Sequence, residues 1–151
     1  MSETPAEQQA APIQVLTQYV RDLSFENPNA PESLVADGEQ PAVQVSVDVT
    51  ARRVQDNLFE VALAIGVDAK RGGKPMFLCE VTYAGAFVVQ GVAEEHLHPF
   101  LLIEGPRLLF PFARAIVNEA VRDGGFPPIM LQPIDFAALY RSRQAQPQGQ
   151  A

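Results

Sequence analysis

The sequence predicts an α+β fold in which helices cover one face of an antiparallel sheet. Apolar and polar residues alternate over 43–50 and again over 59–67, which is the period-two pattern of a strand with one buried face. A third apolar run, 76–90, follows a glycine-containing turn. Helical spacing dominates only later, over 110–121. Strands followed by helices, rather than alternating with them, indicate α+β.

Length and composition predict one domain with a sizeable core. The chain has 151 residues, of which 47% are hydrophobic and 19% charged, so wholesale disorder is excluded. Its net charge of −7 argues against nucleic acid as a partner, because nucleic acid requires clustered Lys and Arg. No stretch approaches the ~18 continuous apolar residues of a membrane span, so direct membrane insertion is not expected.

The single cysteine, Cys79, cannot form an internal disulfide, which favours a reducing compartment. The N-terminus lacks the basic and apolar regions of a signal peptide, and we expect a cytoplasmic protein. Polar, Pro- and Gln-containing composition predicts disordered tails at 1–12 and 144–151. The domain is then expected to span 13–143.

Residues 13–25 fit two secondary structures. Leu16, Val20 and Leu23 have the spacing of a helical stripe, but the same segment also fits a strand with gaps. Asn27-Pro28-Asn29-Ala30-Pro31 ends this segment and starts a loop that runs to about Gln40.

The next segments form a meander of three strands. A turn at 52–57 joins the first two, and a glycine turn at 70–75 joins the second to the third. Gly85 in the third strand suggests a bulge or a close backbone approach.

Three helical segments are expected after the strands. Residues 96–102 form a short helix or an irregular piece, and 110–121 form a helix that Gly124 and Gly125 end. Asp135 is placed to N-cap a last helix from Phe136 to about Arg143. The helix at 110–121 is apolar on nearly every side, which favours an oligomer whose subunits enclose it.

The tract from Gly124 to Tyr140 is apolar, but its prolines at 127, 128 and 133 exclude regular helix or strand. Such an extended loop is either a buried strap over the core or the wall of a groove that binds other apolar chains. The residues alone leave both interpretations open.

Motifs for catalysis or cofactor binding are not found. Nucleotide-binding and hydrolase motifs are missing. His96-x-His98 supplies two ligands where zinc needs three or four, and Cys79 has no basic neighbour to activate it. We therefore expect no catalytic residue, no metal and no cofactor. The alternative is a small-molecule-binding or enzymatic α+β domain that uses the apolar tract as a pocket.

On the third strand, alternation places Leu78 and Glu80 on one face. Together with Asp22 and Glu26 they form an acidic patch with an apolar anchor for a basic peptide, or their exposure is incidental. The residues alone favour the incidental interpretation.

Four segments together resemble the SecB family of protein-export chaperones. They are 22–31 (Asp-Leu-Ser-Phe-Glu-Asn-Pro-Asn-Ala-Pro), 77–87, 109–114 (Leu-Phe-Pro-Phe-Ala-Arg) and 125–136 (Gly-Phe-Pro-Pro-Ile-Met-Leu-Gln-Pro-Ile-Asp-Phe). The resemblance extends in order over about Ile13 to Tyr140.

The resemblance implies a homotetramer, a dimer of dimers, in which each subunit has a four-stranded antiparallel sheet with helices packed on one face. It implies that 13–25 is a strand. It also implies an ATP-independent holdase that binds unfolded secretory preproteins and delivers them to the SecA translocase ATPase.

The resemblance also implies three sets of site residues. SecA contacts would fall on Asp22, Glu26, Leu78 and Glu80. The preprotein groove would be lined by Phe25, Phe126, Ile129, Met130, Leu131, Phe136 and Tyr140. The tetramer interface would involve Cys79, Val81 and Tyr83 on the third strand, with Ile116 and Val117 from the apolar helix.

Overall fold

A computed structural model describes residues 12–35 and 38–145. Most of the two predicted tails, 1–12 and 144–151, lies outside these residues. Among the helices of the described part, none is long and apolar enough to cross a membrane.

The core of the fold is one antiparallel sheet of four strands in the order β1-β4-β3-β2. The strands are β1 (Ile13–Glu26), β2 (Ala42–Gln55), β3 (Leu58–Arg71) and β4 (Lys74–Val89), and a short 3-10 turn, η2 (Glu32–Leu34), follows β1. The predicted α+β sheet is confirmed, and 13–26 is a strand rather than a helix.

The turn between β2 and β3 is shorter than predicted. The prediction of a turn at 52–57 is wrong, because β2 continues to Gln55 and leaves only Asp56 and Asn57 in the loop. Asp56 has a φ of 44°, which two-residue hairpin loops require and which Asp tolerates.

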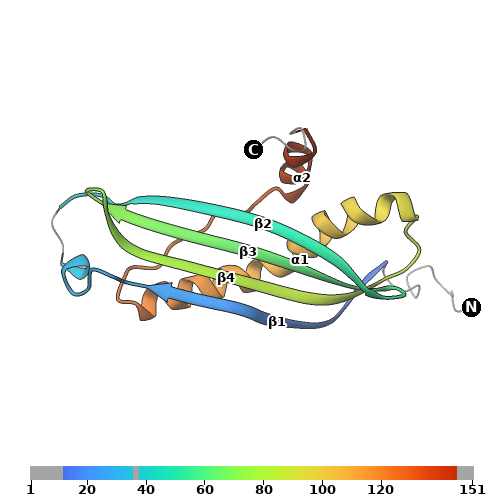
Figure 1. The fold of residues 1–151 in the computed structure, drawn as a ribbon, viewed down its shortest axis with the longest axis horizontal. Coiled ribbons are helices and arrows are strands. Elements are labelled where there is room, and N and C mark those ends of the chain that lie inside the picture. The colour runs from blue at the N-terminus through green and yellow to red at the C-terminus, as the bar shows by residue number, and fades with distance from the viewer. Residues whose placement is uncertain (1–11, 36–37, 146–151) are drawn as a thin grey trace, which may run out of the picture.

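The two faces of the sheet differ sharply. The helix face is buried. Its side chains come from every second position of β3 between Phe59 and Val67 and of β4 between Phe77 and Phe87. The opposite, open face carries the alternate residues, including Leu78, Glu80 and Thr82 of β4. No helix packs on the open face in the described part of the chain (Figure 1).

The helix face is covered by α1 (Glu94–Asp123), a single helix of 30 residues. The prediction of a separate piece at 96–102 and a helix starting at 110 is therefore wrong. Pro99, Pro106 and Pro111 lie inside α1, where each removes one backbone donor. The helix continues through them because apolar side chains along its length are buried against the sheet, and such packing outweighs local propensity.

Two glycines leave room for side chains at the contact between the sheet and α1. A Cβ on Gly105 of α1 would lie 2.8 Å from Cγ1 of Val61, and one on Gly85 of β4 would lie 3.1 Å from Cδ2 of Leu109. The expected close approach at Gly85 is confirmed. The register shifts lie elsewhere. Two are in β1, between Val15 and Thr17 and between Val20 and Asp22, and the pairings of β3 with β2 and with β4 each have one near a strand end.

The helix α1 ends at Gly124 and Gly125, as predicted. The backbone N–H of Phe126 donates to the carbonyl of Val121, and that of Gly125 donates to the carbonyl of Arg122, which is the Schellman arrangement. Residues 126–135 then form no regular structure, as the prolines predict. In Figure 1 this tract passes behind the sheet from the end of α1 to α2 beyond β2.

The last helix, α2 (Phe136–Ala145), begins where predicted. The backbone N–H of Ala138 donates to Oδ1 of Asp135 at 3.0 Å, so Asp135 is the predicted N-cap. Two arginine hydrogen bonds, from Arg143 to the side chain of Asp48 and to the carbonyl of Val47, fasten α2 to β2.

We expect Gly105→Ala to lower the free energy of unfolding by about 1–3 kcal/mol, because the added methyl group overpacks the contact with Val61. Arg107→Ala, on the exposed side of the same helix, is the control and should change it by less than about 0.5 kcal/mol. Urea unfolding at one fixed protein concentration measures both. Equal effects of the two substitutions would show that the contact is not tight.

Candidate functional site

An aromatic cluster lies where β1, β4 and the apolar tract meet. The ring centroids of Phe77 and Phe126 are 4.8 Å apart, those of Phe25 and Phe77 5.6 Å, and those of Phe25 and Phe126 6.4 Å. The Phe25 ring fits only because residue 124 is glycine, since a Cβ there would lie 2.2 Å from the ring. Phe25 itself is half-buried, so the cluster has an accessible side.

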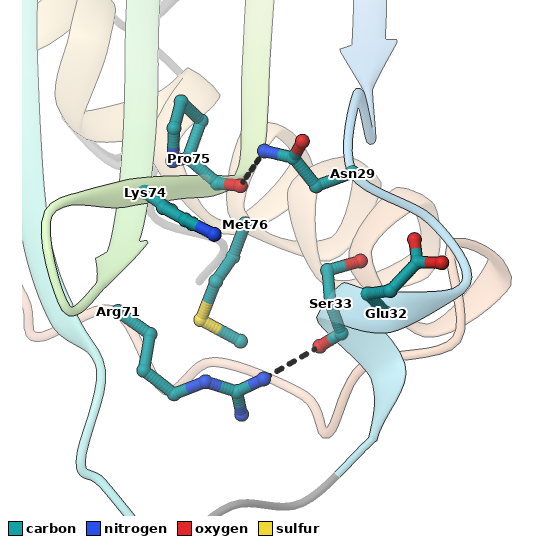
Figure 2. A pocket seen from close by; sticks show the side chains of 7 residues that line it. All are labelled: Asn29, Glu32, Ser33, Arg71, Lys74, Pro75 and Met76. Atoms are coloured by element: carbon teal, nitrogen blue, oxygen red, sulfur yellow. Dashed lines mark hydrogen bonds between the residues drawn. The ribbon is translucent and has the colours of Figure 1, made fainter.

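The loop after β1 borders this cluster and is held in place by polar contacts. Asn29 donates to the carbonyl of Pro75 at 2.9 Å, and Arg71 donates to the carbonyl of Ser33 at 3.3 Å (Figure 2). Arg71 also donates to the carbonyl of Val35 at 2.9 Å. Between loop and turn is a cavity of about 410 Å³ with a largely polar lining. The same loop places Leu34 within 3.0 Å of the position a Cβ of Gly125 would take.

The tract combines both interpretations that its sequence leaves open. Phe126, Leu131 and Phe136 are only 7%, 5% and 3% exposed, so these three side chains hold the tract against the core. Met130 is 76% exposed, and Ile129 is half-buried. The tract is therefore a strap on one side and a free apolar surface on the other.

The cavity beside α2 is too small for a metabolite. It has a volume of about 60 Å³, and its lining includes Val49 of β2, Leu102 of α1 and Tyr140 of α2. Small-molecule sites usually measure about 300–1,000 Å³. The tract thus gives no support to the alternative of a small-molecule pocket.

The open face brings together the predicted acidic patch. In the pairing of β1 with β4, Asp22 lies opposite Thr82, Ser24 opposite Glu80, and Glu26 opposite Leu78. The three carboxylates are exposed and Leu78 is half-buried. Asp68 of β3, which lies opposite Leu78 on the same face, extends the patch and was not expected. The sequence signal for Asp68 was the alternation of β3, which places this residue on the face opposite to Val67.

A buried carboxylate next to this patch was missed altogether. Glu60 of β3 is 7% exposed and accepts hydrogen bonds from Tyr19 Oη at 2.5 Å, Arg52 Nε at 3.0 Å and Arg21 at 3.3 Å. The hydrogen bond from Tyr19, followed by that from Arg52 and the charges of both arginines, holds the pKa of Glu60 below its usual value although burial opposes this. The only sequence signal is a lone carboxylate between the apolar Phe59 and Val61.

Most of the predicted interface residues lie inside the subunit. Cys79, Val81 and Val117 are buried between the sheet and α1, and burial, with a smaller effect of Glu80, raises the pKa of the Cys79 thiol. Tyr83 stacks on Phe112, with ring centroids 6.2 Å apart. Ile116 is half-buried.

Several large apolar side chains near these residues are exposed instead. They are Leu16, Val20 and Leu23 of β1 with Leu108 and Phe112 of α1. Any role of the buried set in assembly therefore has to act through the position of α1.

In the part of the chain that the structure describes, histidines and carboxylates do not converge on a metal site. His96 is exposed, with Nε2 3.9 Å from a carboxylate oxygen of Glu95. Within residues 12–35 and 38–145, no group of three His, Cys, Asp or Glu side chains could hold a metal ion.

Acid should destabilise the wild type more than Glu60→Gln. A carboxyl whose folded-state pKa is depressed stabilises the fold above its unfolded pKa of about 4.3, and this contribution is lost as the pH falls through the folded pKa. The difference in unfolding free energy between the two proteins should therefore shrink as the pH falls below about 4. Denaturant unfolding at several pH values measures it, and a difference independent of pH would contradict the role of the Glu60 charge.

Comparison with known proteins gives a consistent family. The family described as "Preprotein translocase subunit SecB" matches residues 6–147. A "Protein-export protein SecB" of Rhodopseudomonas palustris is 52% identical over 149 residues, covering 97% of this chain and 95% of the relative. One of Caulobacter vibrioides is 50% identical over 145 residues, covering 96% and 89%.

A solved structure shares the fold. It is a SecB-like chaperone of Mycobacterium tuberculosis in complex with a peptide from an antitoxin. The TM-score is 0.67 at 15% sequence identity, and the alignment covers 81% of this chain and 90% of that one.

Proposed function

The chain belongs to the SecB family, and from this premise we propose that it is an ATP-independent holdase for unfolded secretory preproteins in the bacterial cytoplasm. The resemblance seen in the sequence is thereby confirmed, and SecB proteins are non-enzymatic export chaperones. The remaining steps of the proposal concern which residues bind clients, which bind SecA, and how the subunits assemble.

The observation that carries the client proposal is the two-sided tract. A client surface has to remain apolar in water without collapsing into the core, and the buried Phe126, Leu131 and Phe136 anchor the tract so that Met130 stays exposed. A flexible, exposed Met side chain adapts to many apolar sequences. The M. tuberculosis relative that shares the fold was solved with a peptide, which supports peptide binding by this architecture.

The proposed groove uses the accessible members of the predicted set. Phe25 forms one end at the aromatic cluster, Met130 and Ile129 lie along the tract, and Tyr140 of α2 lies at the other end. The buried members support the groove rather than contact the client.

For SecA, we propose the acidic patch on the open face. Asp22, Glu26 and Glu80 surround the half-buried Leu78, so one apolar anchor lies among carboxylates. Such a surface fits a basic segment with an apolar side chain, and charge complementarity contributes mainly to association rate and specificity.

We propose further that the exposed apolar side chains of β1 and α1, such as Leu23 and Phe112, are covered in a homotetramer. Exposed apolar patches of this kind typically mark protein interfaces. Repeating the groove in four copies raises the avidity for a long unfolded chain by roughly 10²–10⁴ without new contact types.

Excess wild-type protein should slow the refolding of a slow-folding precursor without nucleotide, because binding the unfolded state withdraws it from folding. In Met130→Asp, the affinity for the unfolded precursor should fall roughly tenfold, the equivalent of about 1.4 kcal/mol of lost apolar contact. Titration of fluorescently labelled precursor measures the affinity. Unchanged refolding with the wild type would refute the holdase proposal itself.

Leu131→Asp is the matched comparison, one residue away but buried. It should lower the free energy of unfolding by about 2–4 kcal/mol, whereas Met130→Asp should leave it nearly unchanged. If both substitutions unfold the protein, the tract is only a strap and the groove proposal fails.

Glu80→Arg should weaken SecA binding about tenfold or more, because it places a positive charge beside the basic partner. Glu95→Arg makes the same charge change in the exposed first turn of α1, away from the face of Leu108 and Phe112, and should bind SecA as the wild type does. Calorimetry measures the affinity, and light scattering should show one common oligomeric mass for all three proteins. Equal SecA affinities would contradict the patch.

A further inference from the structure

The second bulge of β1 places a cation beside the acidic patch. In a regular strand, neighbouring side chains point to opposite faces, so Arg21 and Asp22 would be separated by the sheet. The register shifts between Val20 and Asp22, which leaves Arg21 as the extra residue. Its guanidinium hydrogen-bonds Glu60 on the open face, and Arg21 and Asp22 line the same hollow of that face.

An arginine in this position would lower the negative charge of the patch if it paired with Asp22. Arg21 and Asp22 are adjacent in sequence and on one face, and charge-assisted hydrogen bonds between a guanidinium and a carboxylate are among the strong ones in proteins. In the described part of the chain, Asp22 has no ion-pair partner, whereas Arg21 pairs with Glu60. The patch therefore keeps the charge of Asp22 because Arg21 is engaged elsewhere.

Glu60 is suited to this engagement. Its side chain is 8% exposed, while those of Arg21 and Arg52 are 50% and 65% exposed. The carboxylate is therefore held in place by its burial, and the two arginine side chains extend over the surface to reach it. Tyr19 donates to Oε2 and both arginines donate to Oε1. An ionised carboxylate that is this buried needs hydrogen-bond donors. Glu60 therefore holds the guanidinium of Arg21 toward β3, an inner strand of the sheet.

We propose that Glu60 is a positioning residue that keeps Arg21 away from Asp22 and so preserves the negative charge of the surface that binds the basic partner. The inference rests on the proposed SecA patch and deepens it by identifying what maintains its charge. Glu60 itself does not touch the partner. Its loss releases Arg21, which then pairs with Asp22 and neutralises one of the patch carboxylates.

The test is a rescue experiment with purified SecA. Glu60→Gln, which keeps the size and hydrogen-bonding capacity of the side chain but not its charge, should bind SecA about three- to tenfold more weakly, the scale of one exposed charge contact. The double variant Glu60→Gln/Arg21→Ala should return the affinity to within about twofold of the wild type, because no arginine remains to cover Asp22. A merely structural role of Glu60 predicts no rescue.

Arg52→Ala is the matched control. Arg52 also pairs with Glu60, but it belongs to β2, which is the edge strand at the other end of the sheet from β1. Its removal should leave SecA affinity within about twofold of the wild type, since Glu60 still holds Arg21. Where Glu60→Gln does not fold, as judged by circular dichroism, Glu60→Asp replaces it, because the shorter carboxylate withdraws from Arg21.

The structure of the Glu60→Gln variant separates this inference from the proposed function. A nitrogen of Arg21 should lie within about 4 Å of a carboxylate oxygen of Asp22. Wild-type protein that does not bind SecA would refute the proposed partner, and the new Arg21–Asp22 pair would still support the positioning role. An Arg21 that stays away from Asp22, or an unrescued double variant, would overturn the inference.

Discussion

The alternation of side chains along β1, β3 and β4 is the constraint on which the rest of the structure depends. Residues of one parity pack under α1 and residues of the other parity face outward, so each strand serves two surfaces at once. On β1 the aromatic cluster takes Phe25 from the helix face, while the acidic patch takes Asp22 and Glu26 from the open face. A slip of one residue in the pairing of β1 with β4 would exchange the two sets.

The bulges of β1 also explain where sequence reasoning succeeds and where it stops. From 58 to 69 the pairing of β3 with β4 runs without a register shift, so the alternation along this part of both strands predicts the strands and their faces correctly. In β1 the shifts at Leu16 and Arg21 reset the period twice, so the same apolar residues fit a helical stripe equally well. A bulge depends on the facing strand, and a single strand's sequence does not contain that information.

The start of α1 and the orientation of the tract also depend on contacts between residues that are distant in sequence. Three prolines argue locally against a helix through 99–111, and only burial of α1 along the sheet outweighs them. The prolines of the tract predict an extended loop correctly. Which of its side chains face inward depends on partners distant in sequence, such as Phe77 beside Phe126 and Phe110 beside Phe136. Glu60 was missed because its donors lie on two other strands.

The placement of the two proposed surfaces bears on how an export chaperone passes on its client. The client groove lies on the side of the sheet that carries α1 and the tract, and the partner patch lies on the open side. A basic partner on the open face therefore does not have to displace the client from Met130 or Phe25 in order to bind. Both surfaces share β1, whose residues from Asp22 to Glu26 alternate between them. In the proposed arrangement β1 is therefore the element at which coupling between partner and client is to be tested, because it contributes side chains to both surfaces.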